Sequence, residues 1–360
     1  MGNYFFLQVF TVIFALSIAT TIFNKRVLGF PQAIGVPIVS AIFVFILQWA
    51  ASLLNGNPFI VINLHNIEEA VRHINFYDFL INGVICFILT SSALKFKVSD
   101  LRSHWKPIGI LASIALVLCA VFFGVALYGY QFLMGQQVDL LVLLLLGAAL
   151  GATDPIGIKG VLSSVRAPHH LMVKLEGESL FNDAMCIAVF MTLLNVLQGE
   201  HFTVIGVLET LLYEIMVAVV IGTAFGHGIL RLLRGKHEME SLILTTALLA
   251  CGSYLVALFA HASAPIACVI GGLIVGNKWK EILHEREIRE VNHFWHTVEG
   301  IINSFLFTLI GLELFILDLS FNLILGGIVA FIILHISRFA ANYLSFAFFP
   351  SFRKKSYNGS

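Results

Sequence analysis

The chain has little charge and lacks the common metal and catalytic motifs. Asp, Glu, Lys and Arg make up 12% of its 360 residues, whereas soluble domains carry about 25%. The cysteines form no C-x-x-C pair and the histidines show no H-E-x-x-H spacing, which argues against a zinc site. The cysteines are instead expected to be small buried hydrophobic residues. Basic and acidic residues number 21 each without a basic tract, so no nucleic-acid partner is expected.

Long apolar runs take the place of charge. Hydrophobic residues make up 59% of the chain, and a helix that crosses a bilayer needs about 20 mostly apolar residues. The composition therefore excludes a soluble globular or disordered protein, and runs of this length exclude the short alternating strands of a β-barrel. We predict an all-α polytopic membrane protein with about eleven transmembrane helices. They are expected at 4–23, 33–54, 77–94, 107–133, 138–165, 171–198, 203–230, 241–260, 264–277, 294–317 and 321–349.

Basic residues are distributed unevenly among the loops between these spans. Nineteen of the 21 Lys and Arg residues lie in odd-numbered loops or in the C-terminal tail, whereas one, Arg72, lies in an even loop and Arg338 lies within the last span. The positive-inside rule then predicts an N-terminus outside and a C-terminus in the cytoplasm. We expect one transmembrane domain over residues 1–350 and a short basic cytoplasmic tail over 351–360.

The motif GATDPIG, at 151–157, interrupts the fifth expected span. An acid in the hydrocarbon costs about 3 kcal/mol or more, so Asp154 is a functional candidate. Pro155 removes a backbone donor and pushes the residue before it away from helical angles. We therefore expect a broken helix near Thr153 and Asp154, where freed carbonyls and two half-helix dipoles would suit a cation. The alternative is a proline kink satisfied by a neighbouring helix.

A second polar cluster, EGESLFNDA at 176–184, lies on the sixth expected span. On a helix, Glu178 lies one turn before Asn182, and Ser179 lies one turn before Asp183, so the four form one polar stripe. A buried carboxylate needs a partner or a proton. Asp183 is therefore the candidate for a group that holds either a proton or a small cation. A structural polar network between helices is the alternative interpretation.

One arginine lies inside the last expected span, in the sequence HISRFAANYL. An unpaired Arg338 would be expensive within the membrane. An ion pair with Glu178 would satisfy both charges and tie the sixth span to the eleventh. We interpret this pair as structural and not as part of a transport site.

Together these motifs resemble those of a known family. TDP at 153–155, followed by ESLFND at 178–183, resembles the monovalent cation:proton antiporters, in the bacterial type of the sodium/proton exchanger branch. The stretches ALKFKVSDLRSHWKPI, at 93–108, and GFPQAIGVPI, at 29–38, are also similar to that family. The resemblance implies an antiporter fold with inverted repeats and two broken helices that cross near the bilayer centre. It also implies a homodimer in the cell (inner) membrane, with no cofactor.

The resemblance further implies roles for individual residues. Asp183 matches the carboxylate that carries the cation or the proton, and Asn182 matches a position that is Asn in electroneutral members. Ser179 and the Thr153 carbonyl match cation ligands, so Na⁺ would be held by Asp183, Ser179 and Thr153. Asp154 matches the acid that caps the broken helix.

The sequence also departs from the family pattern in two places. The pair Glu178 and Arg338 matches the family's salt bridge between helices. Within the third expected span, however, the stretch ILTSSAL at 88–94 lacks the glutamate that some members place near the ion site. The family continues with two further spans beyond the arginine-bearing helix, whereas this sequence ends at Ser360. The last two family helices are therefore expected to be absent.

The sequence favours a secondary active antiporter that exchanges Na⁺ (or Li⁺ or K⁺) for H⁺ by alternating access and without net charge movement. The alternative is a truncated, non-transporting or regulatory homologue, which would explain the short C-terminus. An intramembrane aspartyl protease is the third class considered, because Asp154 and Asp183 both lie in spans. Their flanking residues do not match the Y-D and G-x-G-D motifs of those enzymes, so no enzyme is expected.

Overall fold

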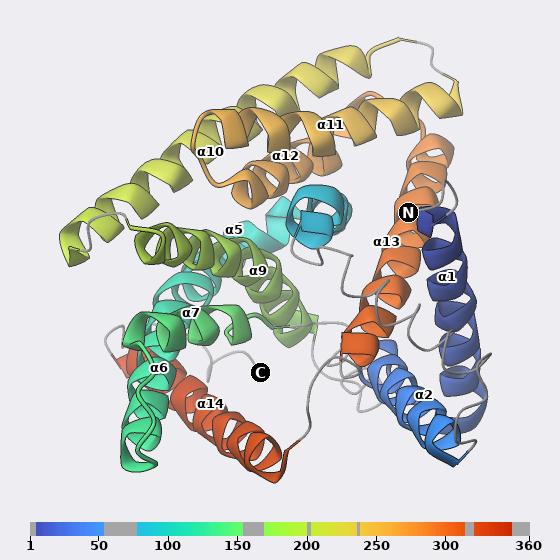
Figure 1. Cartoon of the computed structure of the whole chain (residues 1–360). Helices are drawn as coiled ribbons and strands as arrows, with labels where there is room; N and C mark the ends of the chain where they lie inside the picture. The colour runs from blue at the N-terminus through green and yellow to red at the C-terminus, as the bar shows by residue number, and fades with distance from the viewer. Residues whose placement is uncertain are drawn as a thin grey trace. The chain divides into compact units, whose positions relative to one another are not determined.

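The computed structural model describes residues 5–53, 78–153, 169–199, 203–235, 238–313 and 320–347, and the regular elements within these ranges are all helical. Stretches of π-helix, which have wider turns, lie at Asn24–Leu28, Asp78–Val84 and Ile110–Ala115. A short 3-10 helix, which has narrower turns, lies at Trp279–Glu281. The helices labelled in Figure 1, together with α4, are α1 (Phe5–Phe23), α2 (Gln32–Leu53), α4 (Ile85–Lys95), α5 (Val98–Gly109), α6 (Leu116–Leu133), α7 (Leu140–Leu150), α9 (His169–Leu197), α10 (Val204–Leu232), α11 (Met239–Phe259), α12 (Ala264–Lys278), α13 (Glu285–Glu313) and α14 (Phe321–Ala347).

The prediction of an all-α membrane protein is confirmed, and a helix starts in each of the eleven expected spans or continues through it. Two helices begin well before the predicted residue. The fourth expected span is preceded by α5, and α13 begins at Glu285 and not at 294. In α13 the extra turns are polar and carry i,i+4 ion pairs, Arg286 with Glu290 at 2.8 Å and Arg289 with Glu285 at 3.5 Å. Such pairs support a helix where hydropathy gives no signal.

Several described helices are long and apolar enough to cross a bilayer. They lie at His104–Leu133, Leu171–Leu197, Ile205–Leu232, Met239–Phe259 and Phe321–Ala347. The stretches Ile13–Leu28 and Gln32–Phe43 are together long and apolar enough to cross a bilayer, but they meet at a bend of 110°. The chain is therefore a multi-pass membrane protein.

The described residues fall into two compact units, and α13 contributes to both of them. The first unit contains α1, α2 and the part of α13 that begins at Trp295. Within it, Thr20 Oγ1 lies 3.4 Å from Thr308 Oγ1, and Gln32 Nε2 donates to Ser304 Oγ. A Cβ on Gly311 of α13 would lie 2.3 Å from the Ser40 Cβ, so this glycine allows α13 to pack directly on α2.

The second unit contains the polar motifs of the sequence. In it α6 packs against α7 and α14, α7 packs against α9, and α10 lies along α12 with α11 beside them (Figure 1). Glycines bring the end of α7 onto α6: a Cβ on Gly147 would lie 2.8 Å from the Ala120 carbonyl oxygen, and one on Gly151 would lie 2.5 Å from a Leu116 methyl carbon. This close contact fixes where α7 ends and therefore where its last carbonyl groups lie.

Candidate ion-binding site

The helix that carries the TDP motif stops inside the expected span. Asp139 caps its start, since its Oδ1 accepts a hydrogen bond of 2.9 Å from the Leu141 amide. The helix ends at Leu150, and residues 151–153 are not helical. The predicted break near Thr153 and Asp154 is thus seen on its first side, whereas Asp154 lies outside the described residues.

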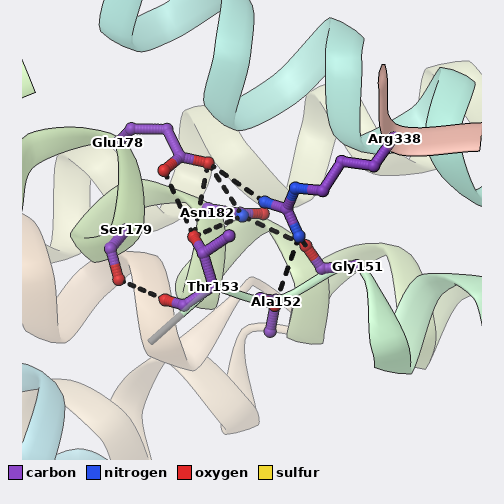
Figure 2. A network of polar contacts seen from close by, with 7 residues as sticks. All are labelled: Gly151, Ala152, Thr153, Glu178, Ser179, Asn182 and Arg338. Carbon is purple, nitrogen blue, oxygen red and sulfur yellow. Dashed lines mark hydrogen bonds and ion pairs between the residues drawn. The ribbon is translucent and has the colours of Figure 1, made fainter. Parts of the chain in front are cut away.

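A helix end leaves carbonyl groups without partners inside the helix. Two side chains from other helices donate to them here (Figure 2). The Gly151 oxygen accepts from Asn182 Nδ2 at 3.1 Å and from Arg338 Nη1 at 3.2 Å, and the Ala152 oxygen lies 3.5 Å from Arg338 Nη1. A cation is favoured at this negative end of the helix dipole. Arg338 on α14 therefore stabilises the end of α7 as well as pairing with an acid.

The next carbonyl contacts α9. The Ser179 hydroxyl donates a hydrogen bond to the Thr153 carbonyl oxygen, and Ser179 is 1% exposed. The two oxygens that the sequence suggests as cation ligands are therefore adjacent (Figure 2). Asp183 lies one helical turn beyond Ser179 and is half-buried. Oxygen ligands of this kind are the ones that hard cations take.

The Glu178 carboxylate contacts donor groups of three side chains. The Thr153 hydroxyl lies 3.2 and 3.3 Å from its two carboxylate oxygens, Asn182 Nδ2 lies 3.1 Å from Oε1, and Arg338 Nη2 lies 3.4 Å from the same atom. The side chains of Glu178 and Arg338 are 12% and 28% exposed. The structure thus brings the two residues of the expected pair together, and it adds Thr153 and the end of α7 to the contact that sequence reasoning suggested.

Asn182 is the central residue of this network, and it is 1% exposed. Its amide nitrogen lies within 3.0 to 3.1 Å of three acceptors: the Gly151 carbonyl oxygen, the Thr153 hydroxyl oxygen and Glu178 Oε1. An amide has two hydrogens, so the three acceptors share them. Its Oδ1 is buried and has no hydrogen-bond partner within the described part of the chain. The Asn182 side chain therefore acts here as a donor that holds the α7 end and the Glu178 carboxylate together.

Sequence reasoning missed one further polar contact. The Cys186 thiol lies 2.8 Å from the Ala148 carbonyl oxygen and 3.8 Å from that of Ala149. Cys186 follows Asn182 by four residues, so it extends the polar stripe of α9 by one further turn, and this spacing was available in the sequence. The expectation that the cysteines are buried holds for four of the five, but Cys251 on α11 is exposed and corrects it.

The sequence of the chain matches a known protein family and several known proteins. Residues 13–358 match the family described as "Sodium/hydrogen exchanger, transmembrane". The chain is 38% identical over 310 residues to the Na⁺/H⁺ antiporter NhaP of Pseudomonas aeruginosa, covering 85% of this chain and 72% of that protein. It is 30% identical to the Na⁺/H⁺ antiporter NhaG of Bacillus atrophaeus, covering 74% of this chain and 50% of that protein.

The fold is also found among solved structures. The sodium proton antiporter MjNhaP1 from Methanocaldococcus jannaschii superposes with a TM-score of 0.73 over 95% of this chain and 79% of that chain, at 17% sequence identity. The chain therefore has an NhaP1-like antiporter fold, and the family is one of transporters and not of enzymes. On the match of nearly its whole length, the chain belongs to the transmembrane sodium/hydrogen exchanger family.

Proposed function

We propose that the chain is a secondary active antiporter that exchanges Na⁺ (or Li⁺ or K⁺) for H⁺ by alternating access. One observation carries the proposal: the Thr153 carbonyl oxygen, freed by the end of α7, lies against the Ser179 hydroxyl, one turn from Asp183. The matched relatives, each described as a Na⁺/H⁺ antiporter, support the same choice of ions.

The proposed cycle uses one site for two ligands. A proton on the Asp183 carboxylate neutralises the site, and a cation replaces that proton with Asp183, Ser179 and the Thr153 carbonyl as ligands. An empty carboxylate would carry an unpaired charge across the hydrocarbon, which is unfavourable. The site therefore changes sides only when it holds a proton or a cation, and exchange is obligatory.

The same chemistry predicts an electroneutral exchange. Asn182 does not titrate, so one cation replaces one proton and no net charge moves. The initial rate of Na⁺-driven proton movement in proteoliposomes should then be equal at zero and at about −100 mV. A transfer of one elementary charge would change the driving force by about 2.3 kcal/mol per 100 mV, and a clear rate change would contradict a one-to-one exchange.

The remaining parts of the proposal concern the membrane and the assembly. Asp154 would cap the broken helix, and the Glu178 and Arg338 pair would be structural. The positive-inside pattern supports an N-terminus outside and a cytoplasmic C-terminus in the cell (inner) membrane. A homodimer is proposed on the family resemblance.

The decisive experiment replaces the proposed carrier group. Asp183→Asn in purified proteoliposomes should abolish Na⁺-dependent dissipation of a pH gradient, because a neutral amide does not exchange a proton for a cation. Asp139→Asn is the matched control. It makes the same chemical change at the start of α7, where Asn caps a helix as well as Asp does, so exchange should persist. Exchange that survives Asp183→Asn at the rate of the control would overturn the proposal.

A further inference from the structure

A cavity of about 470 Å³ lies in the second unit, between the C-terminal end of α10 and the end of α12. Its lining, as far as the described residues show it, includes none of Thr153, Ser179, Asn182 and Asp183. Its polar lining comes from α10 and the turn after it, from the last residue of α12 and from the short turn that follows α12. These residues are His227, Arg231, Arg234, Lys278 and Glu281.

The cavity carries an excess of positive charge. Arg231, Arg234 and Lys278 face one acid, Glu281, and within the described part of the chain none of these four residues forms an ion pair. A basic residue at a helix C-terminus is favoured by the helix dipole. That effect accounts for single cations at the ends of α10 and α12, but not for their convergence on one concave site. An anion in the cavity would compensate the remaining charge.

Hydrogen bonding orients the lysine toward the cavity. His227 Nδ1 lies 2.9 Å from the Thr223 carbonyl oxygen, and this oxygen can only accept, so Nδ1 carries the hydrogen. In the neutral imidazole the other ring nitrogen, Nε2, is then an acceptor, and it lies 3.4 Å from Lys278 Nζ. Two of the three ammonium hydrogens of Lys278 are left for a ligand.

Two residues that line the cavity lie on the same face of α10 as exposed apolar side chains. Met216, Val220, His227 and Arg231 follow one another along α10 at intervals of four, seven and four residues, so all four lie on one face of the helix. Met216 and Val220 are 69% and 68% exposed. Because Ile205–Leu232 is long and apolar enough to cross a bilayer, this face runs from the hydrocarbon to the membrane surface, where the basic residues begin.

We propose that the cavity binds the phosphate of an anionic phospholipid, with one acyl chain lying along the apolar face of α10. Basic pockets between membrane helices are suited to anionic head groups, and the adjoining apolar stripe favours a lipid over a free phosphate. This site is separate from the exchange site, and the proposal does not depend on the ions transported.

The test uses the purified full-length chain in a neutral detergent. Dioleoyl-phosphatidylglycerol should raise the unfolding temperature saturably by about 3–5 °C, whereas dioleoyl-phosphatidylcholine and inorganic phosphate should not. The triple variant Arg231→Gln, Arg234→Gln, Lys278→Gln should lose most of this rise. The matched control is Lys280→Gln, Arg286→Gln, Arg289→Gln, which removes the same charge from nearby residues that do not line the cavity, and it should keep the rise.

Three results would overturn the proposal. The first is an undiminished rise in the cavity variant, and the second is an equal loss in both triple variants, which would indicate a general charge effect. The third is an equal rise with inorganic phosphate alone, which would indicate a free anion site.

A second pair of variants tests the acyl chain. Met216→Ser with Val220→Ser should weaken the effect of dioleoyl-phosphatidylglycerol but not that of the short-chain dihexanoyl lipid with the same head group. Leu244→Ser with Leu248→Ser, on exposed positions of α11, should change neither effect. Light scattering gives the alternative: if the α10 variant halves the protein mass in detergent without added lipid, a second copy covers this face and the lipid assignment fails.

Discussion

The helices α7 and α12 are both held tightly by their neighbours, but by different means. The end of α7 receives hydrogen bonds from side chains of α9 and α14, because its carbonyl groups have no helical partners (Figure 2). The helix α12 continues through its contact with α4 and uses glycines. A Cβ on Gly276 would lie 2.1 Å from the Leu94 carbonyl oxygen, and one on Gly272 would lie 2.7 Å from the Ala93 Cβ.

The difference shows where polar residues are placed in an apolar chain. A continuous helix satisfies its own backbone, so its neighbours need only a matching shape. A helix that ends within a membrane span needs donors, and these are supplied by Asn182, Ser179 and Arg338. Polar side chains therefore gather at the α7 end because the backbone is open there. Removing a donor at the end of α7 and disturbing the close packing of α12 on α4 should therefore lower the free energy of unfolding by different amounts.

The largest effect is expected from the arginine. Arg338→Ala should lower the free energy of unfolding by about 3 kcal/mol, at the low end for breaking a buried ion pair because its side chain is 28% exposed. It leaves the Glu178 carboxylate unpaired and also removes the donor to Gly151 and Ala152. Unfolding of the variant and of the parent chain by increasing concentrations of a denaturing detergent measures the loss of free energy.

A double-mutant cycle separates these two roles. Glu178→Gln removes the acid and leaves Arg338 on the α7 carbonyls, so it should cost less than Arg338→Ala. The double variant should be more stable than the sum of the two single losses predicts. Simple additivity would mean that the two side chains do not interact in solution.

Much of this region could be predicted from the sequence. Pro155 after an acid in an apolar run was enough to indicate the break, and the four-residue spacing of Glu178 and Asn182 gave the polar stripe. The carbonyls of Gly151 and Ala152 could not be predicted as the second partner of Arg338, because backbone acceptors carry no sequence signal. The glycine contacts of α12 with α4 were missed for a related reason: a missing side chain does not reveal which neighbour approaches it.

The second largest effect should come from shape alone. Gly276→Ala would place a methyl carbon against the Leu94 backbone, and backbone cannot move aside without shifting a helix. Overpacking of this kind costs about 1–3 kcal/mol. Gly228→Ala on α10 is the control, since nothing lies within 4 Å of its added Cβ, and it should be neutral or slightly stabilising because Ala favours helix. Thermal unfolding of both variants in the same detergent tests the contrast, and equal melting temperatures would contradict close packing of α12 on α4.

An intermediate effect is expected at Asn182. Asn182→Ala removes the amide that donates to the α7 end and to Glu178, leaving buried acceptors with fewer donors. Such a loss costs about 1–3 kcal/mol, and the lower part of that range is expected here because Arg338 still reaches both acceptors. Combining it with Arg338→Ala should then cost more than the two single losses together. A combined loss equal to the sum would show that the two donors act independently.

The smallest effect should come from the contact that the sequence did not reveal. Cys186→Ala removes a thiol that donates to the Ala148 carbonyl near the end of α7. Cys119→Ala removes the same atoms from a buried position on α6, where no hydrogen bond of the thiol is found within the described residues. The difference between the two losses isolates the hydrogen bond and should be about 0.5–1 kcal/mol, since a thiol is a weak donor. Cys186→Ser should recover part of it, because a hydroxyl donates more strongly although it is smaller. If the two alanine variants unfold at the same denaturant concentration, Cys186 contributes through packing only, and it does not extend the polar stripe of α9.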